Sequence, residues 1–200
     1  VFTVRGEAGG VVRVTGYMRA SGGTLVVDPL IAVQADRVLK GLVMSNNTTD
    51  ATNDIDIAAG AAVSDDGTMI LTYAGGTIQS DVVFDDTGNK GLDTGAVGNN
   101  WYHVWLVGDP TTGVTKAICS LSASAPTLFT GYTKKKCIGS FKRVAGAILP
   151  FTQRGNKSKL NTPILDVSVV GTGAGRTTAL LASVPSGVVG EAWFNAFTSA

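Results

Sequence analysis

The sequence predicts an all-β protein, an antiparallel β-sandwich or barrel-like domain with a small N-terminal β-unit. Helix signals are nearly absent, because no stretch places apolar residues at helical spacing between capping residues. Short runs rich in valine, isoleucine, threonine and aromatic residues recur along the chain, bounded by glycine, asparagine, aspartate or proline. Explicit turn sequences separate them, such as Ser64-Asp65-Asp66-Gly67 and Asp85-Asp86-Thr87-Gly88.

Each predicted strand is one of these runs. The composition changes near residues 34–40, so residues 1–37 are interpreted as a small β connector unit and 38–200 as the main domain. Strands are expected at 1–5, 11–18 and 24–27 in the first unit. In the main domain they are expected at 42–45, 54–58, 68–73, 77–84, 101–107, 114–121, 136–143, 148–153, 159–160, 164–170, 177–184 and 188–194. The loops at 109–113 and 154–157 are expected to join hairpins.

The charge balance disfavours several classes of partner. The chain carries 16 Lys plus Arg against 15 Asp plus Glu, for a net charge of +1. That value argues against nucleic acid or an anionic membrane as the main partner. Apolar runs such as 104–107 and 145–151 are far shorter than the roughly 20 residues of a spanning helix, and no secretory leader opens the chain. Charged residues make up only 16% of the chain, so burial of apolar surface between subunits is expected.

Two cysteines, Cys119 and Cys137, lie in separate apolar segments. They form neither a disulfide framework nor a metal-binding CxxC pair. We expect two reduced thiols in a protein that is folded in cytoplasm.

Four ordered blocks resemble a known family. They are GLVMSNNTTDATNDIDIAAGAAVSDDG (41–67), GNKGLDTGAVGNNWYHVWLV (88–107), SASAPTLFTGYTKKKCIGSF (122–141) and ILPFTQRGNKSKL (148–160). Together they resemble tail-fibre and related virion proteins of tailed bacteriophages and prophages, and they cover about half of residues 38–200. Phe129 stands where that family usually has proline, and Ser158 where it has a bulky residue. Residues 1–37 carry no resemblance.

The resemblance implies a virion location, with assembly in the host bacterial cytoplasm, and a β-structured, oligomeric appendage. It brings no catalytic residues. The expected function is therefore structural, a fibre, spike or adaptor module that mediates assembly and host attachment, and not enzymatic. Tail attachment and head attachment remain open alternatives.

Motifs that suggest enzyme chemistry have simpler interpretations. The glycine-rich stretch 171–178 has neither the spacing nor the lysine of a phosphate-binding loop, and a loop between strands is favoured. His103, the single histidine, lies mid-strand without a nucleophile motif, so packing is favoured over catalysis. Most acidic residues are aspartates in turn sequences, and turn formation is favoured over glycosidase chemistry.

Two further clusters are expected to be structural. Asp50, Asn53, Asp54 and Asp56 resemble the start of a calcium loop, but its glycine and closing glutamate are missing. Turn capping is therefore favoured, and no metal or other cofactor is predicted. The basic run 134–136 is interpreted as a solvated turn or an intersubunit contact, not a nucleic-acid site.

The strand at 101–107 carries the prediction about partners. Alternation places Trp101, His103, Trp105 and Val107 on one face, and the opposite face is also apolar. One face should therefore pack against a second sheet or a neighbouring chain. We expect a homotrimer, together with other phage structural proteins as partners. The alternative is a carbohydrate-binding module that reads host glycans. Trp101, His103, Trp105 and Trp193 are the candidate interface or glycan-stacking residues.

Overall fold

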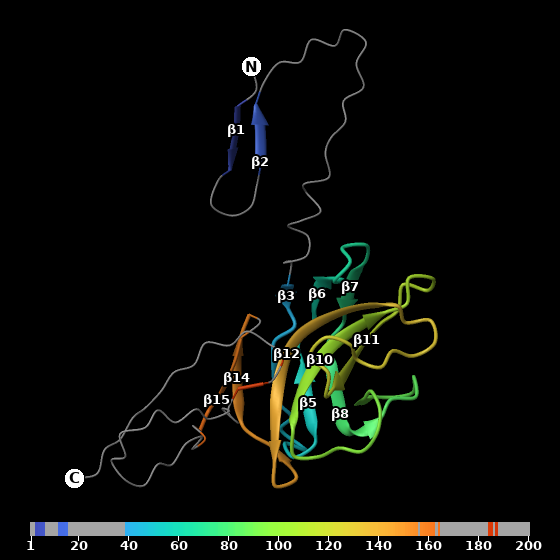
Figure 1. Ribbon diagram of the computed structural model, residues 1–200, viewed down its shortest axis with the longest axis vertical. Coiled ribbons are helices and arrows are strands. Elements are labelled where there is room, and N and C mark those ends of the chain that lie inside the picture. The colour runs from blue at the N-terminus through green and yellow to red at the C-terminus, as the bar shows by residue number, and fades with distance from the viewer. Residues whose placement is uncertain are drawn as a thin grey trace, which may run out of the picture.

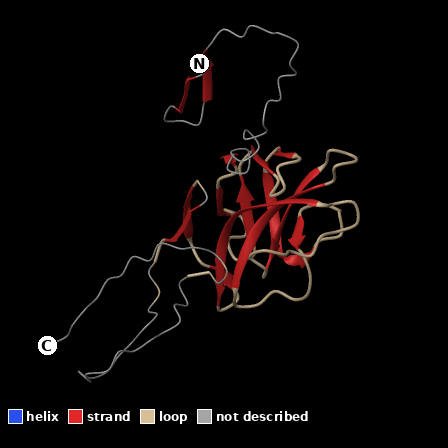
Figure 2. Ribbon diagram, turned by 45° about the horizontal axis from the view of Figure 1, so that its top comes forward, coloured by secondary structure: helices blue, strands red, loops and turns tan. Residues whose placement is uncertain are grey.

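The computed structural model confirms an all-β fold. It describes residues 3–6, 12–15, 39–155, 157–162, 164, 184, 185 and 187. Figure 2 shows strands and loops and no helix in these parts of the chain. Correspondingly, no described helix is long and apolar enough to cross a membrane. The strands predicted at 24–27 and beyond residue 164 lie outside the described residues, as does the glycine-rich stretch 171–178.

Fifteen strands are described (Figure 1). They are β1 Thr3–Gly6, β2 Val12–Thr15, β3 Leu39–Gly41, β4 Met44–Asn46, β5 Asp54–Ile57, β6 Gly60–Val63, β7 Ile70–Tyr73, β8 Gly76–Val83, β9 Lys90–Leu92, β10 Trp101–Gly108, β11 Thr115–Ser120, β12 Lys134–Val144, β13 Ala147–Ile148, β14 Phe151–Arg154 and β15 Lys157–Leu160.

The strands of the main domain form a nearly closed barrel. One eight-stranded sheet has the order β13-β12-β10-β11-β9-β8-β5-β4, and a three-stranded sheet has the order β3-β6-β7. β14 pairs with β15, and β1 pairs with β2 as a separate antiparallel ladder. Every described ladder is antiparallel except those of β9, which runs parallel to β8 and to β11. The predicted all-β, barrel-like fold is therefore confirmed, and among the described strands β9 departs from the antiparallel pairing.

Two strand pairs pass from one sheet to the other at a shared corner. β3 pairs with β6 in the small sheet, and their continuations β4 and β5 pair in the large one. A Cβ atom on Gly41 would lie 2.3 Å from the carbonyl oxygen of Ala59, and one on Gly60 would lie 2.3 Å from that of Lys40. Glycine at these two positions lets the crossing backbones approach each other, as barrel corners require.

The core fills the space between the sheets. Its fully buried members include Leu42, Ile55, Leu71, Tyr102 and Phe141. Tyr102 and Phe141 stack with their ring centroids 5.6 Å apart. The small sheet packs closely on the large one at Gly108, where a Cβ would lie 2.4 Å from Leu71 Cδ2. An alanine at position 108 would therefore force the side chains of Leu71 and Met69 to shift.

One predicted strand is divided in the structure. The run at 148–153 contains the end of β13 and most of β14, which are separated by Leu149 and Pro150. Proline has no amide hydrogen to donate to a ladder, so the chain leaves the large sheet there. β14 then turns into β15 at Arg154–Lys157, and this hairpin was predicted correctly.

Candidate functional site

The two faces of β10 alternate as predicted. Tyr102, Val104 and Leu106 point into the barrel core. Trp105 and Val107 lie in a second cluster on the outer face of the sheet. Both faces of the strand are therefore apolar and buried, and what covers the outer face decides how the candidate residues can act.

The outer face is covered by the chain's own loop between β11 and β12. Trp105 is 2% exposed and packs in a cluster with Phe84, Ile118 and Tyr132. Leu128 and Phe129, from the loop, pack against the same cluster. The Trp105 indole Nε1 donates a hydrogen bond to the Ser122 carbonyl over 3.2 Å. The aromatic and aliphatic side chains of this loop cover the face of β10 that a neighbouring subunit was expected to cover.

Trp105 is consequently not available to a neighbouring subunit or to a sugar. The expectation that this residue forms an interface or a stacking surface is wrong. Trp101 is half-buried at the start of β10, with the Lys142 ammonium 5.6 Å from its ring centroid. Trp193 lies outside the described residues. The two described tryptophans, Trp101 and Trp105, do not form one exposed platform.

His103 is a buried strand residue. It is 1% exposed, and Ser120 and Ser140 lie opposite it on the two neighbouring strands. Its Nδ1 lies 2.9 Å from Ser140 Oγ, while Nε2 has no hydrogen-bond partner in the described part of the chain. Burial lowers the pKa of His103 below its ordinary 6.5. A serine and a histidine do meet here, but a substrate cannot reach the buried pair. Like Trp105, His103 is unavailable as an interface residue.

The basic run 134–136 forms the start of β12 and is used within the chain. Lys134 Nζ lies 2.6 Å from Asp66 Oδ2, and Lys136 Nζ lies 3.1 Å from Asp65 Oδ1. Lys135 lies over the Trp105 ring, 5.2 Å from its centroid. The interpretation as a solvated turn is therefore wrong, because these lysines hold the β6–β7 turn and the outer cluster in place.

Aspartates shape the turns, as the sequence predicts. Asp66 accepts hydrogen bonds from Ser64 Oγ and Thr68 Oγ1, and Asp109 accepts one from the Thr111 amide. The hydrogen bond from Lys134 is the main reason why the pKa of Asp66 is well below its usual range. The pKa of Asp85 falls to about 2, chiefly through its hydrogen bond from Lys90.

The group proposed as a turn cap before β5 divides into two parts. Asp50 Oδ1 accepts hydrogen bonds from the amides of Thr52 and Asn53, which confirms its capping role. Burial, followed by the charges of Asp50, Asp81 and Asp56, raises the pKa of Asp54. Asp56 instead faces outward from β5 and accepts hydrogen bonds from Asn47 Nδ2 and Thr77 Oγ1.

A buried arginine joins several segments at one end of the barrel. Arg143 is 3% exposed, and its guanidinium donates to the carbonyls of Thr52 and Gly146 and to Asn53 Oδ1. A further hydrogen bond reaches Ser80 Oγ over 3.1 Å. Among the described residues, no carboxylate forms an ion pair with it. Local sequence patterns could not predict this role, because all of these acceptors except the Gly146 carbonyl lie about 60 to 90 positions away in the chain.

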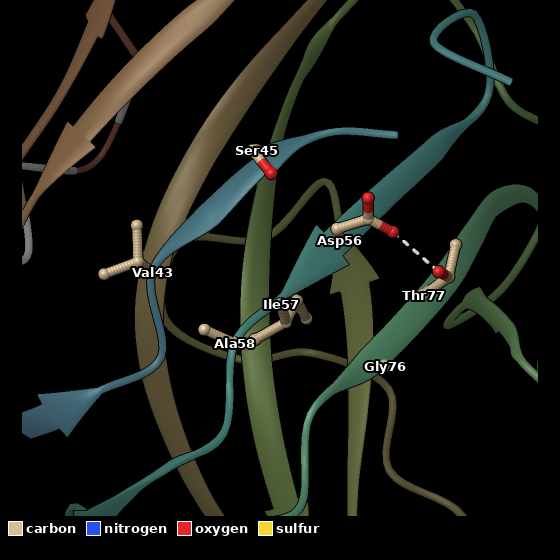
Figure 3. Close-up of a pocket in the computed structure, with 7 residues that line it drawn as sticks. All are labelled: Val43, Ser45, Asp56, Ile57, Ala58, Gly76 and Thr77. Atoms are coloured by element: carbon tan, nitrogen blue, oxygen red, sulfur yellow. Dashed lines mark hydrogen bonds between the residues drawn. The ribbon is translucent and has the colours of Figure 1, made fainter. Parts of the chain in front are cut away.

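A shallow groove crosses β4, β5 and β8 on the outer surface. Its first hollow has a volume of about 390 Å³ and is lined by Val43, Ser45, Asp56, Ile57, Ala58, Gly76 and Thr77 (Figure 3). A second hollow of about 270 Å³ shares Gly76 and Thr77 with the first and continues to Tyr73, Asn89, Lys90 and Lys116. We call the two together the β5–β8 groove.

The groove offers unsatisfied polar groups beside apolar ones. Asp56 Oδ1 takes both hydrogen bonds, at 2.7 Å from Asn47 and 2.6 Å from Thr77, so Oδ2 accepts none from the described residues. Figure 3 shows this second oxygen turned away from Thr77. Val43 is 47% exposed at the other end of the same hollow. Sequence reasoning missed the groove because β4, β5 and β8 come together only through long-range pairing.

Comparison with known proteins adds no relative. No protein-family model, no curated protein and no solved structure matches this chain.

Proposed function

We propose that the chain is a structural module of a tailed-bacteriophage particle, a fibre, spike or adaptor that mediates assembly and host attachment. The observation that carries the proposal is that the polar side chains of the barrel contact other parts of the same barrel. The single histidine is buried, the lysine run and the turn aspartates pair with each other, and Arg143 binds backbone carbonyls. Such an arrangement supports a rigid scaffold, and the resemblance of the four sequence blocks to virion proteins supports the proposed location in a phage particle.

The proposed homotrimer needs an interface other than the outer face of β10. Among the described residues, the large apolar side chains more than 40% exposed are Val43, Ile70, Val83, Val114, Leu121 and Val144. They come from different strands and loops, so a subunit contact would join several of them. Sedimentation equilibrium of the 20.5 kDa chain tests this part directly. A mass three times that of the chain supports the trimer, and a monomer at micromolar concentration rejects it.

Purified phage particles test the proposed location of the chain. Particles purified from a host that carries the phage or prophage should contain the chain in a fixed copy number, measured by quantitative mass spectrometry. Gold-labelled antibody should then mark one appendage. Absence of the chain from purified particles would overturn the structural proposal.

The second candidate function is carbohydrate binding, and the β5–β8 groove is the observation that favours it. The groove combines a carboxylate oxygen without a partner, hydroxyl groups and exposed apolar side chains on a rigid sheet. It replaces the tryptophan platform that the sequence suggested.

A further inference from the structure

We propose that the β5–β8 groove binds a neutral oligosaccharide, with the Asp56 carboxylate as the group that accepts hydrogen bonds from sugar hydroxyls. This inference rests on the carbohydrate-binding function above and assigns its site and ligand class. It does not depend on the chain's location in a particle.

Asp56 is already oriented for this role. The hydrogen bonds from Asn47 and Thr77 to Oδ1 fix the carboxylate plane before a ligand arrives. Oδ2 accepts no hydrogen bond from the described residues and can accept from hydroxyl donors. An oriented charged acceptor makes the stronger kind of hydrogen bond and loses little conformational entropy on binding.

The surroundings of Asp56 match a sugar ring, which has polar edges and apolar C–H faces. Val43 and Ala58 provide an apolar floor, and Ser45 provides a hydroxyl with no hydrogen bond from the described residues. Gly76 also lines this hollow, and a Cβ at that position would point toward the Tyr73 hydroxyl, 3.2 Å away. An apolar floor bordered by a few fixed polar groups is typical of small-molecule sites.

The second hollow extends the same surface. The Tyr73 hydroxyl has no hydrogen-bond partner among the described residues and lies 3.2 Å from the position of a Cβ on Gly76. Its ring gives an aromatic surface for a second sugar, and Asn89 adds an amide. Two hollows that share Gly76 and Thr77 fit a chain of sugars better than one ring.

The charges select a neutral ligand. Lys90 and Lys116, which line the second hollow, are paired with Asp85 and Asp86. Asp56 forms no ion pair with any residue that the structure describes, so this part of the first hollow presents a negative charge. Uronic acids, sialic acids and nucleic acids would be repelled from it.

The test uses the whole chain with cellohexaose, maltohexaose, mannohexaose and chitohexaose as probes. Amide shifts in TROSY NMR spectra report where each probe binds, and their concentration dependence gives the affinity. At least one probe should shift the amides of Val43, Ala58 and Thr77 at millimolar concentration. If all four leave these amides unmoved up to about 10 mM, the proposal is overturned.

Asp56→Asn is the decisive variant. An asparagine can keep Oδ1 in place for Asn47 and Thr77 while its NH₂ group replaces the free acceptor, so the fold is preserved. Affinity should fall about tenfold or more. Asp81→Asn removes an equal charge from an exposed position on β8 outside the groove, and its affinity should stay within about twofold.

Tyr73→Phe tests the second hollow separately. It removes the unpartnered hydroxyl and keeps the ring, so a moderate loss of affinity for a hexaose is expected, with a smaller loss for a disaccharide. Equal affinities of Asp56→Asn and the wild type would overturn the site. Particles that contain the chain while no probe binds would overturn this inference and leave the structural proposal standing.

Discussion

The side chain of Gln153 closes the barrel against Met44. Its Oε1 accepts a hydrogen bond from the Met44 amide of β4 over 2.7 Å, and its Nε2 donates to the Ile138 carbonyl of β12 over 3.0 Å. β14 thus joins β4, at one end of the large sheet, to β12, next to the strand at the other end, without a backbone ladder to either. Ile138 is the extra residue of a β-bulge opposite Val104 and Trp105, so it has no residue facing it on β10.

Replacing Gln153 with leucine should destabilise the protein by about 2–4 kcal/mol. The change leaves a buried amide at Met44 and a buried carbonyl at Ile138 without partners. Urea denaturation followed by tryptophan fluorescence measures this loss of stability. Thr152→Ala, at an exposed neighbouring position, is the control and should change stability little. If the leucine variant and the wild type were equally stable, packing alone would hold β14 against β4 and β12.

Arg143→Lys should also destabilise the fold, by about 2–4 kcal/mol. A lysine ammonium cannot reach the carbonyls of Thr52 and Gly146 and the side chain of Asn53 together, since these require the planar fork of the guanidinium. Thermal unfolding of Arg143→Lys and of exposed Arg154→Lys gives a matched comparison. A melting temperature unchanged from wild type in Arg143→Lys would contradict the role of this cluster.

Trp105→Ala should unfold the chain more easily without changing its oligomeric state. Removing a fully packed indole from the cluster with Phe84 and Tyr132 should cost about 3–5 kcal/mol. Trp101→Ala, at a half-buried position, should cost less. Denaturation curves give the energies, and sedimentation of each variant gives its mass. A variant that keeps its stability but dissociates would restore the intersubunit role of Trp105.

Local patterns predicted much of this fold. The alternation in β10 and the aspartate-led turns are short-range features, and both were confirmed. β6 was missed because Gly60, Ala61 and Ala62 have weak strand propensity and are strands only through pairing with β3 and β7. β9 is only three residues long, and its parallel partners lie far from it in the chain.

The candidate site was less predictable, for the same reason. Trp105 was expected at an interface because the sequence does not show that residues 121–133 fold back over it. Asp56 was grouped with Asp50 and Asp54 because they are neighbours in sequence, although its partner Thr77 is 21 positions away. Local patterns indicate which face of a strand a residue occupies, but long-range topology decides what covers that face.

Cys119 and Cys137 should remain unpaired thiols. Both are free in the structure, and they lie in different clusters, Cys119 in the inner core and Cys137 beside the outer one. Burial raises the pKa of both thiols, so alkylation of the native protein should be slow, and slower at fully buried Cys119. Iodoacetamide mass mapping should find two modified cysteines after denaturation. A crosslinked Cys119–Cys137 peptide under non-reducing conditions would contradict this.

His103 should make the stability depend on pH in the weakly acidic range. Its folded pKa is lowered from 6.5 by burial, so the unfolded chain binds more protons than the folded chain below about pH 6.5. Its contribution is therefore fully present above that pH and is lost as the pH falls, with a limiting slope of about 1.4 kcal/mol per pH unit.

Urea denaturation at intervals between about pH 5 and 8 measures how the free energy of unfolding changes with pH. The variant His103→Gln should abolish the slope that His103 contributes. Asp85→Asn is the control, because it acts in a separate window. The pKa of Asp85 is lowered from 3.8 to about 2, so the stability it contributes is present above about pH 4 and is lost as the pH falls toward 2. The Asp85 variant should therefore keep the slope between pH 5 and 7. A wild-type protein whose stability is flat across that range would show that His103 accepts a proton in the folded barrel as readily as in the unfolded chain.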